Sequence, residues 1–184
     1  MHGCAGKHAE KSGQAALLNT ADGVGMTAMH WAASQDSGKH LSVLLKFGAD
    51  PLVVDQEGKM PVHWAVEAPT PVCLQLMLDA APQLIDAPDA AGRTPLHLAV
   101  ARGDSTLVQH LLETGCHADA VDGTARSALH WAAASGNSEI VGMLVSFGVD
   151  PLLAVRLARR PTYSPFLPPQ PQPPNPVCAA RFPP

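Results

Sequence analysis

A heptapeptide recurs four times along the 184-residue chain and constrains its fold more than any other feature. The copies are TAMHWAA from Thr27, MPVHWAV from Met60, TPLHLAV from Thr94 and SALHWAA from Ser127. Their starts are 33, 34 and 33 residues apart. A repeat of 33 or 34 residues is a supersecondary unit that cannot bury its apolar face alone, so neighbouring copies must stack. The sequence therefore predicts a solenoid.

Other positions recur in register with the heptapeptide. An aspartate stands five residues before each start, at Asp22, Asp55, Asp89 and Asp122. A glycine stands two residues before it in three copies, at Gly25, Gly58 and Gly92, whereas the fourth copy has Ala125. An apolar quartet spaced i, i+1, i+4, i+5 follows each copy and indicates one face of a helix. The quartets are His40/Leu41/Leu44/Leu45, Cys73/Leu74/Met77/Leu78, Leu107/Val108/Leu111/Leu112 and Ile140/Val141/Leu144/Val145.

The third copy has the local signals of two short helices. Thr94 is a suitable N-cap, and Pro95 follows at the first helical position, where its missing N–H costs nothing. Gly103 then ends the first helix. The second helix is expected from about Ser105 to Thr114, with Gly115 as the residue after it.

This pattern resembles the ankyrin repeat, D-x-x-G-x-T-P-L-H-x-A-A-x-x-G followed by an apolar helix and L-L-x-x-G-A-D. The matching residues include Thr94-Pro95-Leu96-His97 and Gly48-Ala49-Asp50, and the resemblance extends from about Asp22 to Leu153. It implies an all-α ankyrin-repeat solenoid of stacked helix-turn-helix pairs with projecting hairpin turns. We expect an N-terminal lead over 1–14, a repeat domain over 15–155 and a Pro-rich tail over 156–184. The four repeats are placed at about 22–54, 55–88, 89–121 and 122–155.

The first two repeats depart from the family pattern. Met60 replaces the threonine cap, which is expected to cost about 1 kcal/mol. Asp36 and Pro69 replace the glycine between the helices. The second repeat also ends in LDAAPQLIDAPD, which is one residue longer and lacks Gly-Ala-Asp. Repeats three and four are therefore expected to be more regular than repeat two.

Four histidines, His30, His63, His97 and His130, occupy the same place in successive repeats. Packed helices stand roughly 8–10 Å apart, whereas zinc needs every ligating nitrogen within about 2.1 Å of one ion. The spacing therefore argues against a metal site. The family resemblance implies that each imidazole bonds to its own cap region and to the neighbouring turn.

Three of these histidines precede a tryptophan, at Trp31, Trp64 and Trp131; the third copy has Leu98. The rings are expected to pack between repeats. The alternative is a partly exposed aromatic stripe on the concave face, which suits partner capture because tryptophan is enriched at binding hot spots.

No motif points to catalysis, a cofactor or a bound metal. Walker A, G-x-S-x-G and H-E-x-x-H sequences are absent. Residues 1–155 carry a formal charge of −8, which argues against nucleic-acid binding. The four cysteines, Cys4, Cys73, Cys116 and Cys178, form no C-x-x-C pair, which favours a reducing, intracellular location, cytoplasmic or nuclear. No apolar run has the length of a membrane helix.

Two segments flank the repeats. Lys7 to Leu18 is predicted to form a short helix, with a disordered lead as the alternative. DPLLAVRLARR, from Asp150, fits either the start of another hairpin or a short capping helix that Pro161 stops, and we favour the helix. Ten of the last 24 residues are proline, which predicts disorder or polyproline II, with Pro-x-x-Pro sequences and two weak phosphorylation motifs. The abrupt change near Arg156 suggests a truncated, alternatively spliced form of a longer protein.

The resemblance implies a non-catalytic protein-binding scaffold or adaptor, expected to be monomeric. Its contacts are expected at hairpin tips and inner-helix ends. The candidate residues are Val24, Met26, Trp31, Gln35, Glu57, Lys59, Trp64, Glu67, Arg93, Arg102, Arg126 and Trp131. One alternative is a dedicated inhibitor or regulator of an enzyme or transcription factor. Another is a truncated isoform with little independent function.

Overall fold

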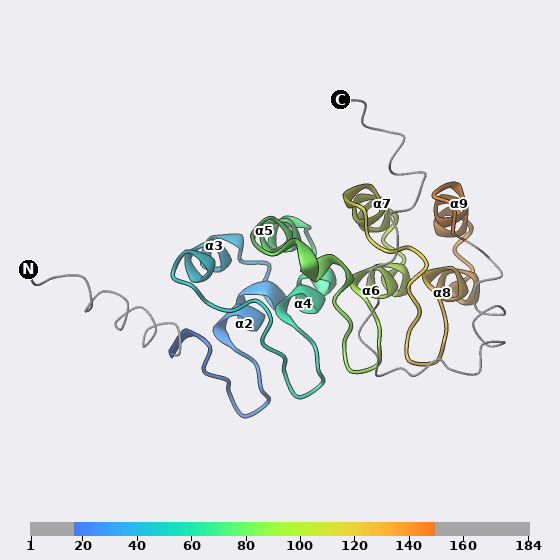
Figure 1. Ribbon diagram of the computed structural model, residues 1–184. Coiled ribbons are helices and arrows are strands. Elements are labelled where there is room, and N and C mark those ends of the chain that lie inside the picture. The colour runs from blue at the N-terminus through green and yellow to red at the C-terminus, as the bar shows by residue number, and fades with distance from the viewer. Residues whose placement is uncertain (1–16, 150–184) are drawn as a thin grey trace, which may run out of the picture. The chain divides into compact units, whose positions relative to one another are not determined.

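Short α-helices in consecutive pairs make up the computed structural model, which describes residues 17–149 (Figure 1). No strand occurs within that range, so the all-α class is confirmed. The pairs are α2 (Ala28–Ser34) with α3 (Gly38–Lys46), α4 (Pro61–Glu67) with α5 (Val72–Ala80), α6 (Pro95–Arg102) with α7 (Ser105–Thr114), and α8 (Ala128–Ser135) with α9 (Ser138–Ser146). A 3₁₀ helix, η1 (Pro82–Asp86), follows α5.

The described residues divide into two compact units, 17–90 and 91–149. In the first unit α2 packs against α4 and α3 packs against α5. In the second unit α6 packs against α8 and α7 against α9. Within each unit, the first helices of the pairs lie side by side, and the long hairpin loops project away from the second helices (Figure 1). Each unit is therefore two stacked helix-turn-helix pairs.

The predicted caps begin the helices. Thr27, Thr94 and Ser127 are the N-caps of α2, α6 and α8, and each has extended backbone geometry. The second helices of the last two pairs have side-chain caps. The Asp104 carboxylate accepts a hydrogen bond from Leu107 N–H, and the Asn137 carbonyl accepts one from Ile140 N–H. Helix α7 spans the predicted residues, and Gly115 is its left-handed C-cap.

The turn between the paired helices needs a residue in the left-handed region, where φ is positive. Gly103 and Gly136 fill it in the last two pairs, with φ of 73° and 72°. Asp36 takes the same conformation in the first pair, with φ of 51°. The turn of the second pair has a different conformation, because the C-cap of α4 is the extended residue Ala68, which precedes Pro69.

Repeat two is the irregular one, as predicted. Its α4 has 7 residues, as α2 has, against 8 for both α6 and α8. The PQLID sequence forms η1, which buries Leu84 completely. The extra residue of this repeat is therefore accommodated in a 3₁₀ turn between α5 and the next hairpin.

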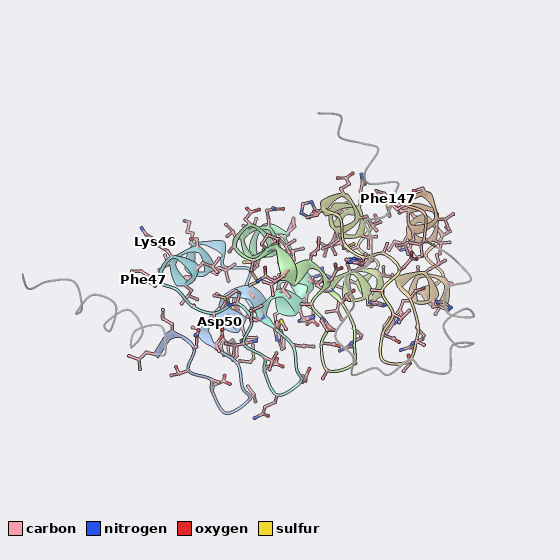
Figure 2. The ribbon with its side chains drawn as sticks, in the orientation of Figure 1. Lys46, Phe47, Asp50 and Phe147 are labelled. Carbon is pink, nitrogen blue, oxygen red and sulfur yellow. The ribbon has the colours of Figure 1, made fainter. Side chains whose placement is uncertain are left out.

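The apolar quartets are buried to different extents in the four second helices. All four members are buried in α5 and in α7. In α3, however, only Leu41 is buried, and His40 is exposed. In α9, Ile140 and Leu144 are buried but Val145 is 52% exposed. Phe47, the C-cap of α3, is another exposed apolar residue (Figure 2).

Several predictions concern residues outside the described range of 17–149. These are most of the Lys7–Leu18 helix, the segment from Asp150, and the Pro-rich tail with its Pro-x-x-Pro and phosphorylation motifs. Within the described range, every helix is too short or too polar to cross a bilayer.

Candidate functional site

His30 and His97 each connect their own hairpin to the one that follows. In His30, Nδ1 lies 3.0 Å from the Thr27 backbone nitrogen and 2.9 Å from the Thr27 hydroxyl. Nε2 lies 3.1 Å from the carbonyl oxygen of Lys59, in the next hairpin. Because a backbone N–H can only donate and a carbonyl can only accept, Nδ1 must be unprotonated and Nε2 must carry the proton. The neutral imidazole is therefore the form that fits.

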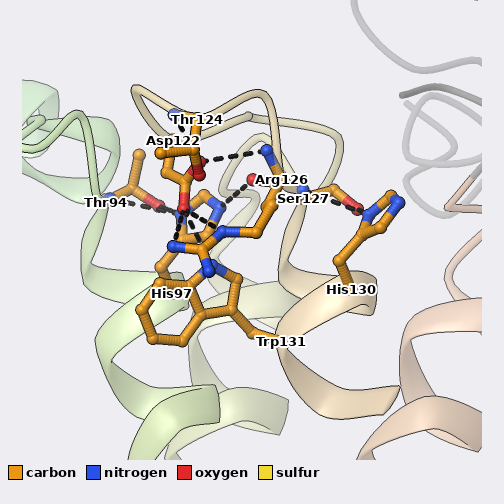
Figure 3. Close-up of polar contacts among 8 residues, drawn as sticks. All are labelled: Thr94, His97, Asp122, Thr124, Arg126, Ser127, His130 and Trp131. Atoms are coloured by element: carbon orange, nitrogen blue, oxygen red, sulfur yellow. Dashed lines mark hydrogen bonds and ion pairs between the residues drawn. The ribbon is translucent and has the colours of Figure 1, made fainter. Parts of the chain in front are cut away.

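His97 repeats this arrangement, whereas His63 keeps the bond to its cap but reaches Ala87, which precedes the third hairpin. His63 accepts from Met60 N–H at 2.9 Å and donates to the Ala87 carbonyl at 2.9 Å, and His97 reaches the Arg126 carbonyl at 3.1 Å (Figure 3). Burial lowers the pKa of His30 and His63, despite the hydrogen bonds to their carbonyl partners. The predicted bonds from the imidazole to its own cap and to the neighbouring turn are confirmed for His30 and His97.

His130 completes only half of this arrangement. Its Nδ1 lies 2.8 Å from the Ser127 hydroxyl and 3.3 Å from the backbone nitrogen of the same residue. The residues from 17 to 149 contain no following hairpin, and the His130 ring is half-buried, whereas the other three are fully buried.

The recurring aspartates hold both the hairpin and the tryptophan. In the first repeat, Asp22 Oδ1 accepts from the backbone N–H groups of Val24 and Met26, at 3.0 and 2.9 Å. Asp22 Oδ2 accepts from the indole N–H of Trp31 at 3.0 Å. The pairs Asp55–Trp64 and Asp122–Trp131 have the same indole bond, at 2.9 and 3.0 Å. A carboxylate therefore fixes the tip and the ring together.

Sequence reasoning missed these aspartate–tryptophan pairs. The signal was present, because a tryptophan lies nine residues after the aspartate in three of the four repeats. The third repeat has Leu98 at that position and breaks the pattern.

A basic side chain covers two of the three indole rings. Lys59 Nζ lies 4.7 Å from the centroid of Trp64, and Arg126 Cζ lies 4.7 Å from that of Trp131. The Arg126 guanidinium also lies 3.0 Å from Asp122 Oδ2 (Figure 3). Both rings are half-buried. A cation that stacks on an indole face is attracted by its π electrons, so these pairs hold the tips in place.

Ion pairs further restrain the charged tips. Lys59 lies 3.2 Å from Glu57 and 3.3 Å from Glu67. Burial would lower the pKa of Lys59, but the Glu57 hydrogen bond and the Glu67 charge outweigh it and raise that pKa. In the fourth hairpin, burial would raise the pKa of Asp122. Hydrogen bonds from Thr124, Arg126 and Trp131 outweigh it and hold that pKa well below its usual range.

Most of the candidate contact residues lie at the surface. Those exposed are Val24, Trp31, Gln35, Glu57, Glu67, Arg102 and Arg126, and those half-buried are Lys59, Trp64, Arg93 and Trp131. Met26 requires a correction. It is 8% exposed and belongs to the buried core. A shallow hollow in the second unit is lined by Ala101, Arg126, His130, Trp131, Ala134 and Ser135.

The cysteines within residues 17–149 have the environment of packing residues. Cys73 is fully buried in α5. Burial, followed by the charge of Asp36, raises the pKa of its thiol to about 11, so the reactive thiolate is disfavoured at neutral pH. Cys116 is half-buried. Among the described residues, no group of three or more potential metal ligands comes together.

Comparison with known proteins points to one repeat class. Residues 70–154 match a family model described as ankyrin repeats (3 copies), and residues 24–56 match an ankyrin repeat model. Together these matches cover more than half of the chain.

Individual relatives share these repeats. Human inversin is 39% identical over 99 residues, which are 51% of this chain and 9% of inversin. Human ankyrin repeat domain-containing protein 63 is 34% identical over 101 residues, 53% of this chain and 27% of that protein. Human B-cell lymphoma 3 protein is 36% identical over 96 residues, 50% of this chain and 21% of that protein. The matched stretch therefore spans less than a third of each relative.

Proposed function

The chain belongs to the ankyrin repeat family, and on that premise we propose that it is a non-catalytic scaffold or adaptor that binds partner proteins. Its contact surface is formed by the hairpin tips and the exposed ends of the first helices in each pair. Ankyrin repeats imply protein–protein interaction; the choice of surface rests on the observations that follow.

One observation carries the proposal. The residues that recur in every repeat form hydrogen bonds within the framework, whereas the residues that differ between repeats are exposed. The histidines and cap hydroxyls are bonded within the hairpin framework. The tip position two residues after the recurring aspartate differs in every repeat and is exposed in each, as Val24, Glu57, Ala91 and Thr124. A constant framework that presents variable side chains is suited to selecting one partner over another.

The chemistry of these outward residues fits a protein partner. Tryptophan and arginine are the residue types that most often dominate binding energy at interfaces. Here Trp131 and Arg126 are held together by Asp122, beside the hollow on α6 and α8. Side chains that are already ordered lose little conformational entropy when a partner docks.

Charge reversal at the tips tests the proposal. The full chain carrying Lys59→Glu and Arg126→Glu is compared with wild type by proximity labelling in cells. The matched control carries Lys39→Glu and Lys46→Glu on α3, which changes the net charge by the same amount on exposed residues away from the tips. Circular dichroism confirms that both variants are folded.

We expect the tip variant to lose partners that the α3 variant keeps. An identical partner set for wild type and the tip variant would contradict the proposed surface. A single stoichiometric partner would favour a dedicated regulator over a general scaffold.

A further inference from the structure

Three aspartate–tryptophan pairs share one geometry but differ in what lies on the indole face. In the second and fourth repeats, the residue four positions after the aspartate is basic, Lys59 or Arg126, and it covers the ring at 4.7 Å. In the first repeat the residue at that position is Met26, which is uncharged and buried. Among the described residues, no basic side chain stacks on Trp31, and the ring is 50% exposed.

The exposed ring retains its carboxylate partner. Asp22 Oδ2 accepts the Trp31 indole N–H at 3.0 Å, as Asp122 Oδ2 does for Trp131. In the fourth repeat the same Asp122 oxygen also accepts from the Arg126 guanidinium at 3.0 Å. The Trp31 hydrogen bond, followed by that of Val24, lowers the pKa of Asp22, so its carboxylate stays charged at neutral pH. The first repeat thus has both groups that hold Arg126 but no arginine.

From this comparison we propose that Asp22 and Trp31 form a docking site for an arginine side chain of a partner protein. The guanidinium stacks on the indole face and bonds to the carboxylate, in the place that Arg126 takes on Trp131. This inference rests on the proposed protein-binding function and gives one contact of that surface its chemistry.

Arginine fits the site better than lysine for a structural reason. Lys59 lies over Trp64, but its ammonium group is also held by Glu57 and Glu67. The residues equivalent to those two glutamates in the first repeat are Val24 and Ser34, which carry no charge. A planar guanidinium stacks and donates to Asp22 at the same time without further acids, whereas an ammonium group is a compact point charge.

The chain contains its own controls for a binding experiment. Its three tryptophans give three indole N–H signals in a proton–nitrogen NMR spectrum, and replacing Trp31 with phenylalanine identifies one of them. N-acetyl-L-arginine amide is titrated into the full chain at constant ionic strength. We expect only the Trp31 signal to shift, with half-saturation on the order of 100 mM, because Lys59 and Arg126 already cover the other two rings.

Ligand and protein variants separate charge from shape. N-acetyl-L-citrulline amide, which is uncharged but similar in shape, should cause no selective shift, and the lysine derivative should bind more weakly than arginine. Asp22→Asn should weaken arginine binding by up to about fivefold. Met26→Arg should abolish the response by supplying the missing cation, and Met26→Leu should preserve it.

Equal shifts of all three indole signals, equal binding of arginine and citrulline, or no shift at Trp31 would each overturn the arginine site. Those results would leave the broader function standing, because charge reversal at Lys59 and Arg126 tests that function at other residues. Conversely, an unchanged partner set in that experiment would not alter the response of Trp31 to arginine.

Discussion

At the scale of single residues, the hairpin turn shows how one position can be constrained twice. Gly25, Gly58 and Gly92 have φ of 81°, 69° and 75°, a region that residues with a side chain rarely adopt. A Cβ on Gly92 would also lie 2.6 Å from the backbone nitrogen of Gly123, in the next hairpin. Ala125 keeps the positive φ, at 61°, and residues 17–149 place no further hairpin after it. At Ala125, therefore, the positive φ is the only one of these two constraints that applies.

Ala125→Gly is expected to raise the free energy of unfolding by about 0.5–1 kcal/mol, because it removes the penalty for a side chain at positive φ. Gly92→Ala at the equivalent position should lower it by at least about 1 kcal/mol, since strain and the close approach act together. Urea unfolding followed by circular dichroism measures both changes. A destabilised Ala125→Gly variant would show that the turn is not under strain.

At the scale of elements, helices with the same sequence pattern differ in how much of it they bury. Val108 on α7 is fully buried, whereas Val145 on α9 is 52% exposed, although both belong to the recurring quartets. In the second unit α7 packs against α6 and α9, and α9 packs against α8 and α7. Membership of the apolar quartet therefore does not by itself decide whether a residue of a second helix is buried.

A pair of identical truncations tests this difference. Val108→Ala should lower the free energy of unfolding by about 2–3 kcal/mol, because it removes two buried methyl groups and leaves a cavity. Val145→Ala should change it by less than about 0.5 kcal/mol, since the side chain is already half in water and alanine favours a helix. Denaturant midpoints at one pH give both values. Equal losses would mean that Val145 is covered in solution.

At the scale of the whole molecule, the buried histidines make stability depend on pH. Burial lowers the pKa of His30 and His63 in the folded state, so the unfolded chain binds more protons below its own histidine pKa of about 6.5. Their contribution is complete above that pH and is lost as the pH falls. The lowered pKa values of Asp22, Asp104 and Asp122 act in the same direction, but only below about pH 4.

We therefore expect the free energy of unfolding to fall between pH 7.5 and pH 5, by up to about 1.4 kcal/mol per pH unit for each of the two histidines. Urea midpoints across this range measure the slope. His30→Gln should reduce the slope. A flat profile from pH 7.5 to pH 5 would contradict the neutral, buried imidazoles.

The chain's sequence by itself determined the repeat and the helix pairs, and its resemblance to the ankyrin repeat implied the role of the histidines. These follow from local signals, because a cap such as Thr94, a glycine such as Gly103 and the bond from His97 back to its cap all act within about one helical turn. The span of α7 was predictable for the same reason. The link from His97 to the next hairpin then follows from regular stacking.

Only the tertiary structure decided which of the repeated groups are exposed. Met26 and Trp31 were both candidate contact residues, although packing between repeats was the preferred prediction for Trp31; the structure buries Met26 and leaves Trp31 50% exposed. Whether an indole face is covered depends on a side chain from the hairpin, such as Arg126, and on the carboxylate that holds it. The exposure of a side chain depends on the neighbours that folding brings next to it. Residues with the same place in the repeat can therefore differ in exposure.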